Sequence, residues 1–240
     1  MDTRFWGPDG WKLLHTITEN YPDKPNKKEQ ELYKKFFLSL PFVLPCIYCR
    51  NSLAEYMKEL PLIDNLSSKN KLCLWLYRIH NKVNRKLKNQ GLNKKKNPKY
   101  KDVRAFYKNY MYTINKNNCV DSPGWEFLYS IVFNYPVSKK DLDKRRYEQH
   151  LIFFLTYPKI IPFRKIQPLL SLNMETKTVN KALHKRSLLK RFLYRLETKA
   201  KKHINQKCSS YTLRCVNVEK YRANCKKTTC RKKMNSNNPV

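Results

Sequence analysis

Two cysteines separated by two residues, Cys46 and Cys49, form the segment of this chain that is best suited to redox chemistry. Pro45 precedes the pair, and a run of helix-forming residues follows it as far as Leu60. The N-terminal end of a helix carries partial positive charge, so it favours the thiolate form of a cysteine in its first turn. The pair therefore suits thiol–disulfide exchange, although this spacing alone is also consistent with metal binding.

Two further groups of side chains could bind a ligand on either side of the pair. Trp11 and His15 are four residues apart and share one face of an expected helix. A later stripe at helical spacing mixes an imidazole, an amide and aliphatic groups, namely His80, Val83, Asn84 and Leu87. A single histidine facing a core is more often structural, but a mixed stripe of this kind suits a planar heteroaromatic ligand.

The elements that must position these residues are expected to be helices. The chain has only four glycines, and apolar residues recur at helical spacing through its first half. Helices are expected at about residues 10–20, 29–40, 46–60, 67–88 and 101–112. The first should follow Pro8 and Asp9, and Pro41 and Pro45 should end the second. This pattern predicts an all-α fold built on a small helical bundle.

The second half contains an internal repeat of the first. Residues 10–22 align with 124–136, sharing a Gly-Trp start and an Asn-Tyr-Pro end. At a slightly larger offset, residues 36–41 match 153–158, Pro45 matches Pro162, and residues 76–78 match 193–195. These matches predict a degenerate copy of the bundle, the alternative being two unrelated helical segments of similar composition. The copy lacks the candidate chemistry, because Cys46, Cys49, His15, His80 and Asn81 become Phe163, Ile166, Tyr129, Glu197 and Thr198.

The predicted organisation has three parts. Residues 1–115 form the bundle with the candidate site, residues 116–205 form the degenerate helical copy, and residues 206–240 form a basic tail that contains cysteines.

The composition limits the classes of function. A net charge of +33 favours salt-dependent, nonspecific contact with polyanions, although codon bias in an AT-rich genome would also enrich lysine. The first residues show no apolar leader, so we expect no secretion by a signal peptide. We also expect no membrane span, because no apolar run approaches the roughly 18 residues that one needs. Eight cysteines in such a chain favour redox catalysis or metal binding over a secreted disulfide scaffold.

Three elements in this order resemble the Erv/ALR family of FAD-linked sulfhydryl oxidases. They are Trp6-Gly7-Pro8 with Trp11, His15 and Tyr21-Pro22; then Pro45-Cys46-x-x-Cys49; then Trp75-x4-His80-Asn81-x-Val83-Asn84. The resemblance covers about residues 1–112 and implies a four-helix bundle with a short fifth helix around FAD. The overall plan is similar to the sulfhydryl oxidases of large DNA viruses, which implies a location in the host cytoplasm, at the viral factory, or in the virion.

The resemblance also implies roles for individual residues. Cys46 would be the exposed cysteine that exchanges with substrate, and Cys49 would lie against the flavin as the charge-transfer thiolate. The implied FAD-binding residues are Gly7, Trp11, His15, Tyr21, Cys49, His80, Asn81, Val83, Asn84, Lys86 and Leu87. Electrons would pass from dithiols of reduced substrate proteins through the pair and the flavin to oxygen, giving hydrogen peroxide. The family implies a homodimer, for which the second half could substitute as an internal pseudo-dimer.

The chain departs from the family pattern in two respects. No further cysteine pair follows the His80 stripe, and Cys73 is expected to be a small buried hydrophobe rather than a ligand. The segment 88–96 is an insertion where the family has a short turn, which leaves the contacts to the FAD phosphates open. The lysines in this insertion could supply positive charge.

The cysteines near the end of the chain have three interpretations. Cys225 and Cys230 resemble the Cys-x4-Cys shuttle of some family members, whereas structural disulfides that also involve Cys208 and Cys215 are the plainer option. Zinc binding with His203 is the third, although the spacings differ from common zinc sites and we predict no metal site. Cys119 has no partner nearby in the sequence. The alternative function for the whole chain is a basic nucleic-acid-binding or virion-packaging protein with a structural metal site.

Overall fold

The computed structural model describes residues 1–92, 95–117 and 124–223, and these residues form an all-α fold, which confirms the predicted fold class. The first half contains α1 (Thr3–Glu19), α2 (Lys27–Val43), α3 (Ile47–Glu59), the 3-10 turn η1 (Ile63–Asn65), α4 (Lys69–Asn89) and α5 (Tyr100–Asn117). The second half contains α6 (Trp125–Asn134), the 3-10 turn η2 (Lys139–Asp141), α7 (Lys144–Ile160), α8 (Gln167–Asn173), α9 (Thr176–Ala182), α10 (Arg186–His203) and α11 (Tyr211–Ala223). No helix in these ranges is long and apolar enough to cross a membrane.

A side-chain cap sets the start of the first helix, and a proline lies inside each of the first two helices. The Asp2 carboxylate accepts a hydrogen bond from the Arg4 amide at 2.8 Å, so α1 begins well before the predicted start. Pro8 lies inside α1 and Pro41 lies inside α2, because a proline removes one backbone hydrogen bond and tertiary packing compensates for that loss. The predicted end of α2 at Pro41 is therefore wrong, and the helix continues to Val43, two residues before Pro45, the other proline predicted to end it.

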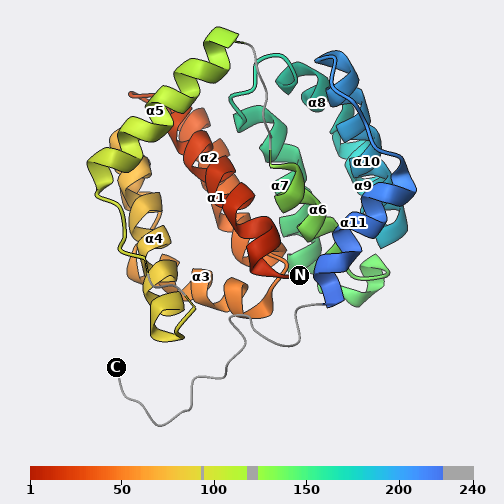
Figure 1. Ribbon diagram of the computed structural model, residues 1–240, viewed down its shortest axis with the longest axis horizontal. Coiled ribbons are helices and arrows are strands. Elements are labelled where there is room, and N and C mark those ends of the chain that lie inside the picture. The colour runs from red at the N-terminus through yellow and green to blue at the C-terminus, as the bar shows by residue number, and fades with distance from the viewer. Residues whose placement is uncertain (93–94, 118–123, 224–240) are drawn as a thin grey trace.

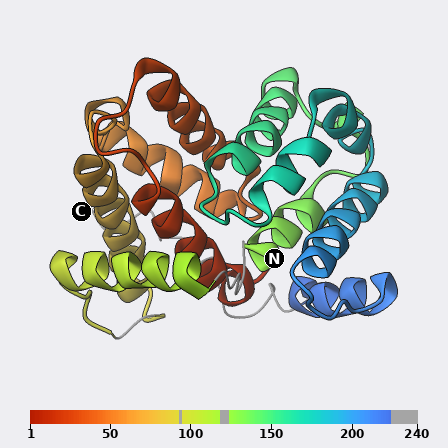
Figure 2. The same cartoon turned by 90° about the horizontal axis from the view of Figure 1, so that it is seen from above.

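The two halves lie side by side, with α1 to α5 in one group and α6 to α11 in the other (Figure 1). They meet where α2 packs against α7 and α1 packs against α6. At the centre of this interface, the rings of Phe36 and Phe153 stack with their centroids 5.4 Å apart. Seen from above, α5 and α11 run along the same side of the molecule, one on each half (Figure 2).

Two contacts across the interface are reciprocal, because each joins a glycine of one aligned segment to a larger residue of the other. A Cβ atom added to Gly10 would lie 3.0 Å from the ring of Phe127, and one added to Gly124 would lie 2.6 Å from the side chain of Leu13. Gly10 aligns with Gly124, and Leu13 aligns with Phe127. Such reciprocity is typical of a two-fold interface, here formed within one chain.

Contacts inside each half also match. The hydroxyl of Tyr21 donates to the carbonyl of Leu66 at 2.7 Å, and the hydroxyl of Tyr135 donates to the carbonyl of Leu183 at the same distance. Both tyrosines end the aligned segments of the repeat. This agreement supports the predicted duplication.

A second pair of tyrosines relates α11 to α5. The hydroxyl of Tyr77 donates to the carbonyl of Pro98, and that of Tyr194 donates to the carbonyl of Ser209, each at 2.9 Å. Each ring also contacts the first residue of the helix that follows, with centroids 5.2 Å apart in both cases. The structure thus places a packed helix, whose contacts resemble those of α5, within the segment 206–240 that is predicted to be a tail. In addition, α5 has 18 residues and is longer than the short fifth helix predicted.

The close approach of Gly124 to Leu13 predicts a measurable cost for a side chain at that position. Gly124 has a φ of +86°, so Gly124→Ala combines backbone strain with a clash at the interface. We expect it to lower the free energy of unfolding by about 2–3 kcal/mol in a denaturant titration. Gly91→Ala is the matched control, because Gly91 has a φ of +70° but no atom within 4 Å of an added Cβ. It should cost about 1 kcal/mol, and equal losses in the two variants would contradict a tight interface at Gly124.

Candidate functional site

A cavity of about 900 Å³ lies among α1, α3 and α4, at the upper end of the roughly 300–1,000 Å³ typical of small-molecule sites. Its walls are mostly apolar and aromatic. Residues of the first half that line it but were not predicted include Trp6, Leu14, Leu44, Ser52, Leu53, Met57, Trp75, Ile79, Lys95 and Tyr107. Eight of the eleven predicted FAD-binding residues also line it, namely Gly7, Trp11, Cys49, His80, Val83, Asn84, Lys86 and Leu87. The two faces predicted from helical spacing therefore meet in one cavity.

The aromatic wall of the cavity is built from α1 and α4. The rings of Trp11 and His80 stack with their centroids 3.8 Å apart and their planes within 6° of parallel. Behind them, His15 Nε2 lies 3.1 Å from His80 Nδ1, so one imidazole donates a hydrogen bond and the other accepts it. Tyr107 of α5 covers the other side of His15, with ring centroids 4.8 Å apart. His15 is thus outside the cavity and orients His80, which lines it.

Burial keeps both imidazoles neutral. It lowers the pKa of His15 to about 3, and the neighbouring His80 lowers it further. Burial likewise lowers the pKa of His80 to about 4. At neutral pH the pair therefore presents a hydrogen-bonding, uncharged surface next to the cavity.

Besides His15, two further predicted FAD-binding residues, Tyr21 and Asn81, are not among the residues that line the cavity. Tyr21 is fully buried at the end of α1, where its ring contacts Tyr33 and its hydroxyl is bound to Leu66. Its matching counterpart in the second half makes the same bond, which indicates a structural role. Asn81 follows His80 on α4 but is not among the lining residues.

The two cysteines of the pair occupy different environments. Cys46 is the N-cap of α3, and its carbonyl accepts hydrogen bonds from the amides of Cys49 and Arg50 at 3.1 and 3.0 Å. Cys49 therefore lies in the first turn, where it is half-buried and lines the cavity. Cys46 is only 7% exposed, in contrast to the exposed position that the family resemblance implies, because it packs into the core cluster. The residues between them, Ile47 and Tyr48, are 50% and 37% exposed and form the protein surface next to the pair.

Positive charge lies beside the two sulfurs. Arg50 is held by a hydrogen bond from its guanidinium to the Leu44 carbonyl at 2.9 Å. Burial lowers the pKa of Arg50 and so does the charge of Arg146, while Cys46 and Cys49 act in the opposite direction. A guanidinium in this place favours the thiolates that exchange requires.

The cavity also contains groups that fit a large, partly anionic ligand. The indole N–H of Trp6 is buried at its wall and has no hydrogen-bond partner, so a ligand oxygen or nitrogen would satisfy it. Lys86 donates to Ser52 at the wall, and Lys95 from the inserted segment also reaches it. A Cβ added to Gly7 would meet no atom within 4 Å, which leaves open space at the start of α1. Trp6 could have been predicted as a lining residue from the Trp6-Gly7-Pro8 motif. For Lys95, the sequence offers only the basic composition of the inserted segment.

The other cysteines that the structure describes do not join this site. Cys73 is 3% exposed, and burial raises the pKa of its thiol to about 11, with a further contribution from Glu19. It behaves as the small buried residue predicted. Cys208 is exposed and Cys215 half-buried, whereas Cys119, Cys225 and Cys230 lie outside the described residues. Within the described ranges, no group of three or more histidine, cysteine or acidic side chains could hold a metal ion.

A helical bundle that sets a Cys-x-x-Cys pair against a cofactor-sized aromatic cavity defines a thiol redox site. Sequence comparison agrees, because the profile of the Erv1 / Alr family matches residues 8–104. A probable FAD-linked sulfhydryl oxidase of Acanthamoeba polyphaga mimivirus is 39% identical over 85 residues, which cover 35% of this chain and 59% of that protein. A protein of Invertebrate iridescent virus 6, provisionally named an FAD-linked sulfhydryl oxidase, is 30% identical over 92 residues, covering 36% of this chain and 83% of its own length. The mitochondrial FAD-linked sulfhydryl oxidase of Saccharomyces cerevisiae is 31% identical over 87 residues, covering 36% of this chain and 45% of that protein.

The chain belongs to the Erv1 / Alr family. The match spans only about half of several curated relatives and lies in the first half of this chain. The second half, with α6 to α11, is outside it.

The buried histidine pair predicts a loss of stability in mild acid. As the pH falls below the ordinary histidine pKa, the unfolded chain takes up protons that the folded chain rejects until about pH 4, so the free energy of unfolding falls in that window. We expect His80→Phe to reduce the loss between pH 7 and pH 5 by about 2 kcal/mol, measured by urea titration of flavin-free protein. His203→Phe, on the exposed end of α10, should leave the slope unchanged. An unchanged slope in His80→Phe would show that this imidazole takes up its proton over the same pH range in the folded and the unfolded chain, and would contradict the lowered pKa.

Proposed function

We propose that the protein is an FAD-dependent thiol oxidase that forms disulfide bonds in reduced substrate proteins. The observation that carries this proposal is the position of Cys49, which lies in the first turn of α3 and lines the same cavity as the stacked Trp11 and His80. The relatives named above are FAD-linked sulfhydryl oxidases, and the lining residues fit a ligand with a planar aromatic body and anionic groups.

The cysteines carry out the exchange steps. When they are joined as a disulfide, a substrate thiolate attacks the sulfur of Cys46 and the Cys46–Cys49 bond breaks, which leaves Cys49 as a thiolate. A second substrate thiol then displaces Cys46, so the substrate gains a disulfide and the pair becomes a dithiol. FAD, when bound, accepts the two electrons of this dithiol and passes them to oxygen to give hydrogen peroxide. The Arg50 guanidinium stabilises the thiolates formed in these steps, and Ile47 and Tyr48 offer an apolar surface to the substrate.

Single replacements of the cysteines test this assignment. We expect Cys46→Ser and Cys49→Ser each to lower dithiothreitol-dependent oxygen consumption at least about a hundredfold, because neither variant can form the exchanging disulfide. Cys73→Ser is the matched control, since its thiol is buried away from the cavity, and it should keep activity within about twofold. Full activity without Cys49, or equal losses in all three variants, would contradict the assignment.

We also propose that Cys225 and Cys230 form the shuttle, although both lie outside the described residues. The end of α11 is fixed at the start of α1, where the Asp2 amide donates to the Tyr221 carbonyl at 3.2 Å and the rings of Phe5 and Tyr221 stack at 4.2 Å. The residues that follow Asp2 line the cavity. Cys225 is four residues beyond Tyr221, and four extended residues span at most about 14 Å.

A double variant separates a shuttle from a structural disulfide. Under the shuttle proposal, Cys225→Ser with Cys230→Ser slows the oxidation of a reduced protein substrate about tenfold but spares dithiothreitol, which reaches the Cys46–Cys49 pair directly. Cys208→Ser, exposed near the start of α11, is the control. Equal rates of the double variant and the wild type on both substrates would contradict the shuttle. Loss of bound zinc or of folding stability would favour the other two interpretations.

For the second half, we propose a degenerate copy of the bundle that takes the place of a partner subunit, with α11 as its fifth helix. The exchanged glycine contacts and the matched tyrosine bonds support this proposal. Sedimentation should then show a monomer, whereas a homodimer through the first half would contradict it.

The proposal has three further parts. Oxygen is the electron acceptor, the protein is located at the viral factory or in the virion, and it makes salt-dependent contacts with polyanions. The viral relatives support the location, and the net charge supports the polyanion contact. The alternative of a nucleic-acid-binding protein with a structural metal site gains no support from the described residues, which hold no candidate metal cluster.

A further inference from the structure

The second half contains a polar cluster at the place that corresponds to the histidine pair. In the repeat, Tyr129 aligns with His15, and Glu197 aligns with His80. The Tyr129 hydroxyl donates to a Glu197 carboxylate oxygen at 2.7 Å, so the contact between the two helices is kept while its chemistry is changed. Glu197 is only 4% exposed and therefore requires compensating positive charge.

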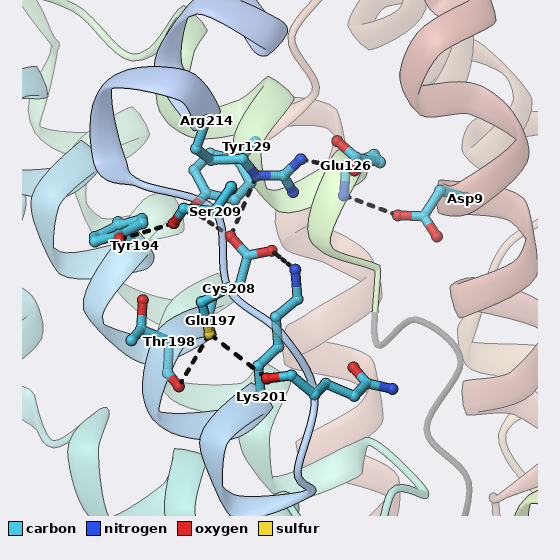
Figure 3. A network of polar contacts seen from close by, with 11 residues as sticks. Asp9, Glu126, Tyr129, Tyr194, Glu197, Thr198, Lys201, Cys208, Ser209 and Arg214 are labelled. Atoms are coloured by element: carbon cyan, nitrogen blue, oxygen red, sulfur yellow. Dashed lines mark hydrogen bonds and ion pairs between the residues drawn. The ribbon is translucent and has the colours of Figure 1, made fainter.

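Arg214 of α11 and Lys201 of α10 supply that charge (Figure 3). Its guanidinium lies 4.2 Å from the centre of the Tyr129 ring, and its Nε is 3.2 Å from the carboxylate of Glu197. Lys201 completes the neutralisation, with its Nζ 2.7 Å from the other carboxylate oxygen. Burial alone would lower the pKa of Arg214, but the carboxylates of Glu197 and Glu126 raise it above its usual value. Arg214 thus stacks on the counterpart of His15 in the second half, as Tyr107 does on His15 in the first.

The network extends from Arg214 to helix α1. A terminal nitrogen of Arg214 is 2.9 Å from Glu126, in the first turn of α6. The amide of Glu126 donates to the carboxylate of Asp9 on α1 at 2.9 Å (Figure 3). The amide of Phe127 donates to the same carboxylate at 3.3 Å. Since α6 begins at Gly124, which has no side chain to cap it, Asp9 provides the cap from the other half. The first turn of α6 is therefore held on one side by α11 and on the other by α1.

This turn forms part of the cofactor cavity. Among the described residues that line the cavity, Phe127 alone comes from the second half. Its ring is fully buried, lies 5.8 Å from the ring of Trp6 and packs against Gly10. The cavity of the first half is thus completed by a side chain that lies outside the region matched by the family profile.

We propose that the second half has replaced its own ligand site by the Arg214 network, and that this network positions Phe127 as a fixed wall of the FAD cavity. Arg214 is accordingly a positioning residue that acts through Glu126 and the first turn of α6, and each chain takes one FAD. The inference rests on the proposed function, because it requires that the cavity binds FAD.

The test is FAD titration of flavin-free protein, followed by flavin fluorescence, with the melting temperature measured alongside. Arg214→Met keeps the length of the side chain but removes the charge, and it should weaken FAD binding about three- to tenfold. Phe127→Leu leaves the network intact and keeps an apolar core residue, and it should weaken binding to a similar extent. Arg191→Met is the matched control, since Arg191 is exposed on α10, lies beside Tyr211 with its guanidinium 6.0 Å from the ring, and is not among the residues that line the cavity. It should leave FAD affinity unchanged, and the wild type should bind one FAD per chain.

The outcomes separate the two proposals. If Arg214→Met lowers the melting temperature while its FAD affinity and that of Phe127→Leu equal the wild type, the network serves stability alone and the inference fails. Two flavins per wild-type chain would also overturn it. If the wild type binds no FAD at all, the proposed function fails first and the inference fails with it.

Discussion

Helix α1 is the element on which both the cavity and the interface between the halves depend. It carries Trp11, which stacks on His80, and the preceding residue Gly10, which lets Phe127 of α6 approach to van der Waals distance. A larger residue at Gly10 would press on the Phe127 ring and move the cavity wall. Because a single helix serves both functions, the geometry of the redox site is coupled to the packing of the second half.

The chemistry of the site follows from where the backbone of α3 begins. The N-cap position at Cys46 places Cys49 in the first turn, where the helix end, the Arg50 guanidinium and the cavity converge. The neutral histidine pair contributes shape and hydrogen bonding without adding charge next to the sulfurs. In the second half, the positions that align with His15 and His80 hold Tyr129 and Glu197, which are joined by a hydrogen bond, and Arg214 and Lys201 balance the charge of Glu197. Under the proposed duplication, the first half binds a ligand at this place, whereas the second half fills it with its own side chains.

Much of this site could be predicted from the sequence, because its main parts are local patterns. Helical spacing put His80 and Asn84 on one face, and the Cys-x-x-Cys pair before a helix-forming run indicated its position at a helix start. Tyr21 is predicted from the family motif alone, whereas in the structure it lies outside the cavity lining and its hydroxyl donates to the Leu66 carbonyl. The helix limits near Pro8 and Pro41 were wrong because capping and tertiary packing outweigh the loss of one hydrogen bond.

What the sequence could not predict depends on contacts between distant segments. The burial of Cys46 follows from packing with residues of other helices. No motif around Phe127 or Arg214 indicates that either residue lies near the site. The residues of α11 have the basic composition of a tail, and it is their packing against α6 that distinguishes them from one. The internal repeat contains the one sequence signal for this network. It aligns Glu197 with the buried His80, and a carboxylate at a buried position needs a cation nearby.

The most direct test of the account is the visible spectrum of the purified full-length protein during anaerobic addition of a dithiol. If Cys46 and Cys49 deliver electrons to FAD held in the α1–α4 cavity, the protein is yellow, its flavin absorbance bleaches as dithiol is added, and the colour returns when oxygen is admitted. A protein that binds flavin but does not bleach, or one that carries no flavin, would contradict it.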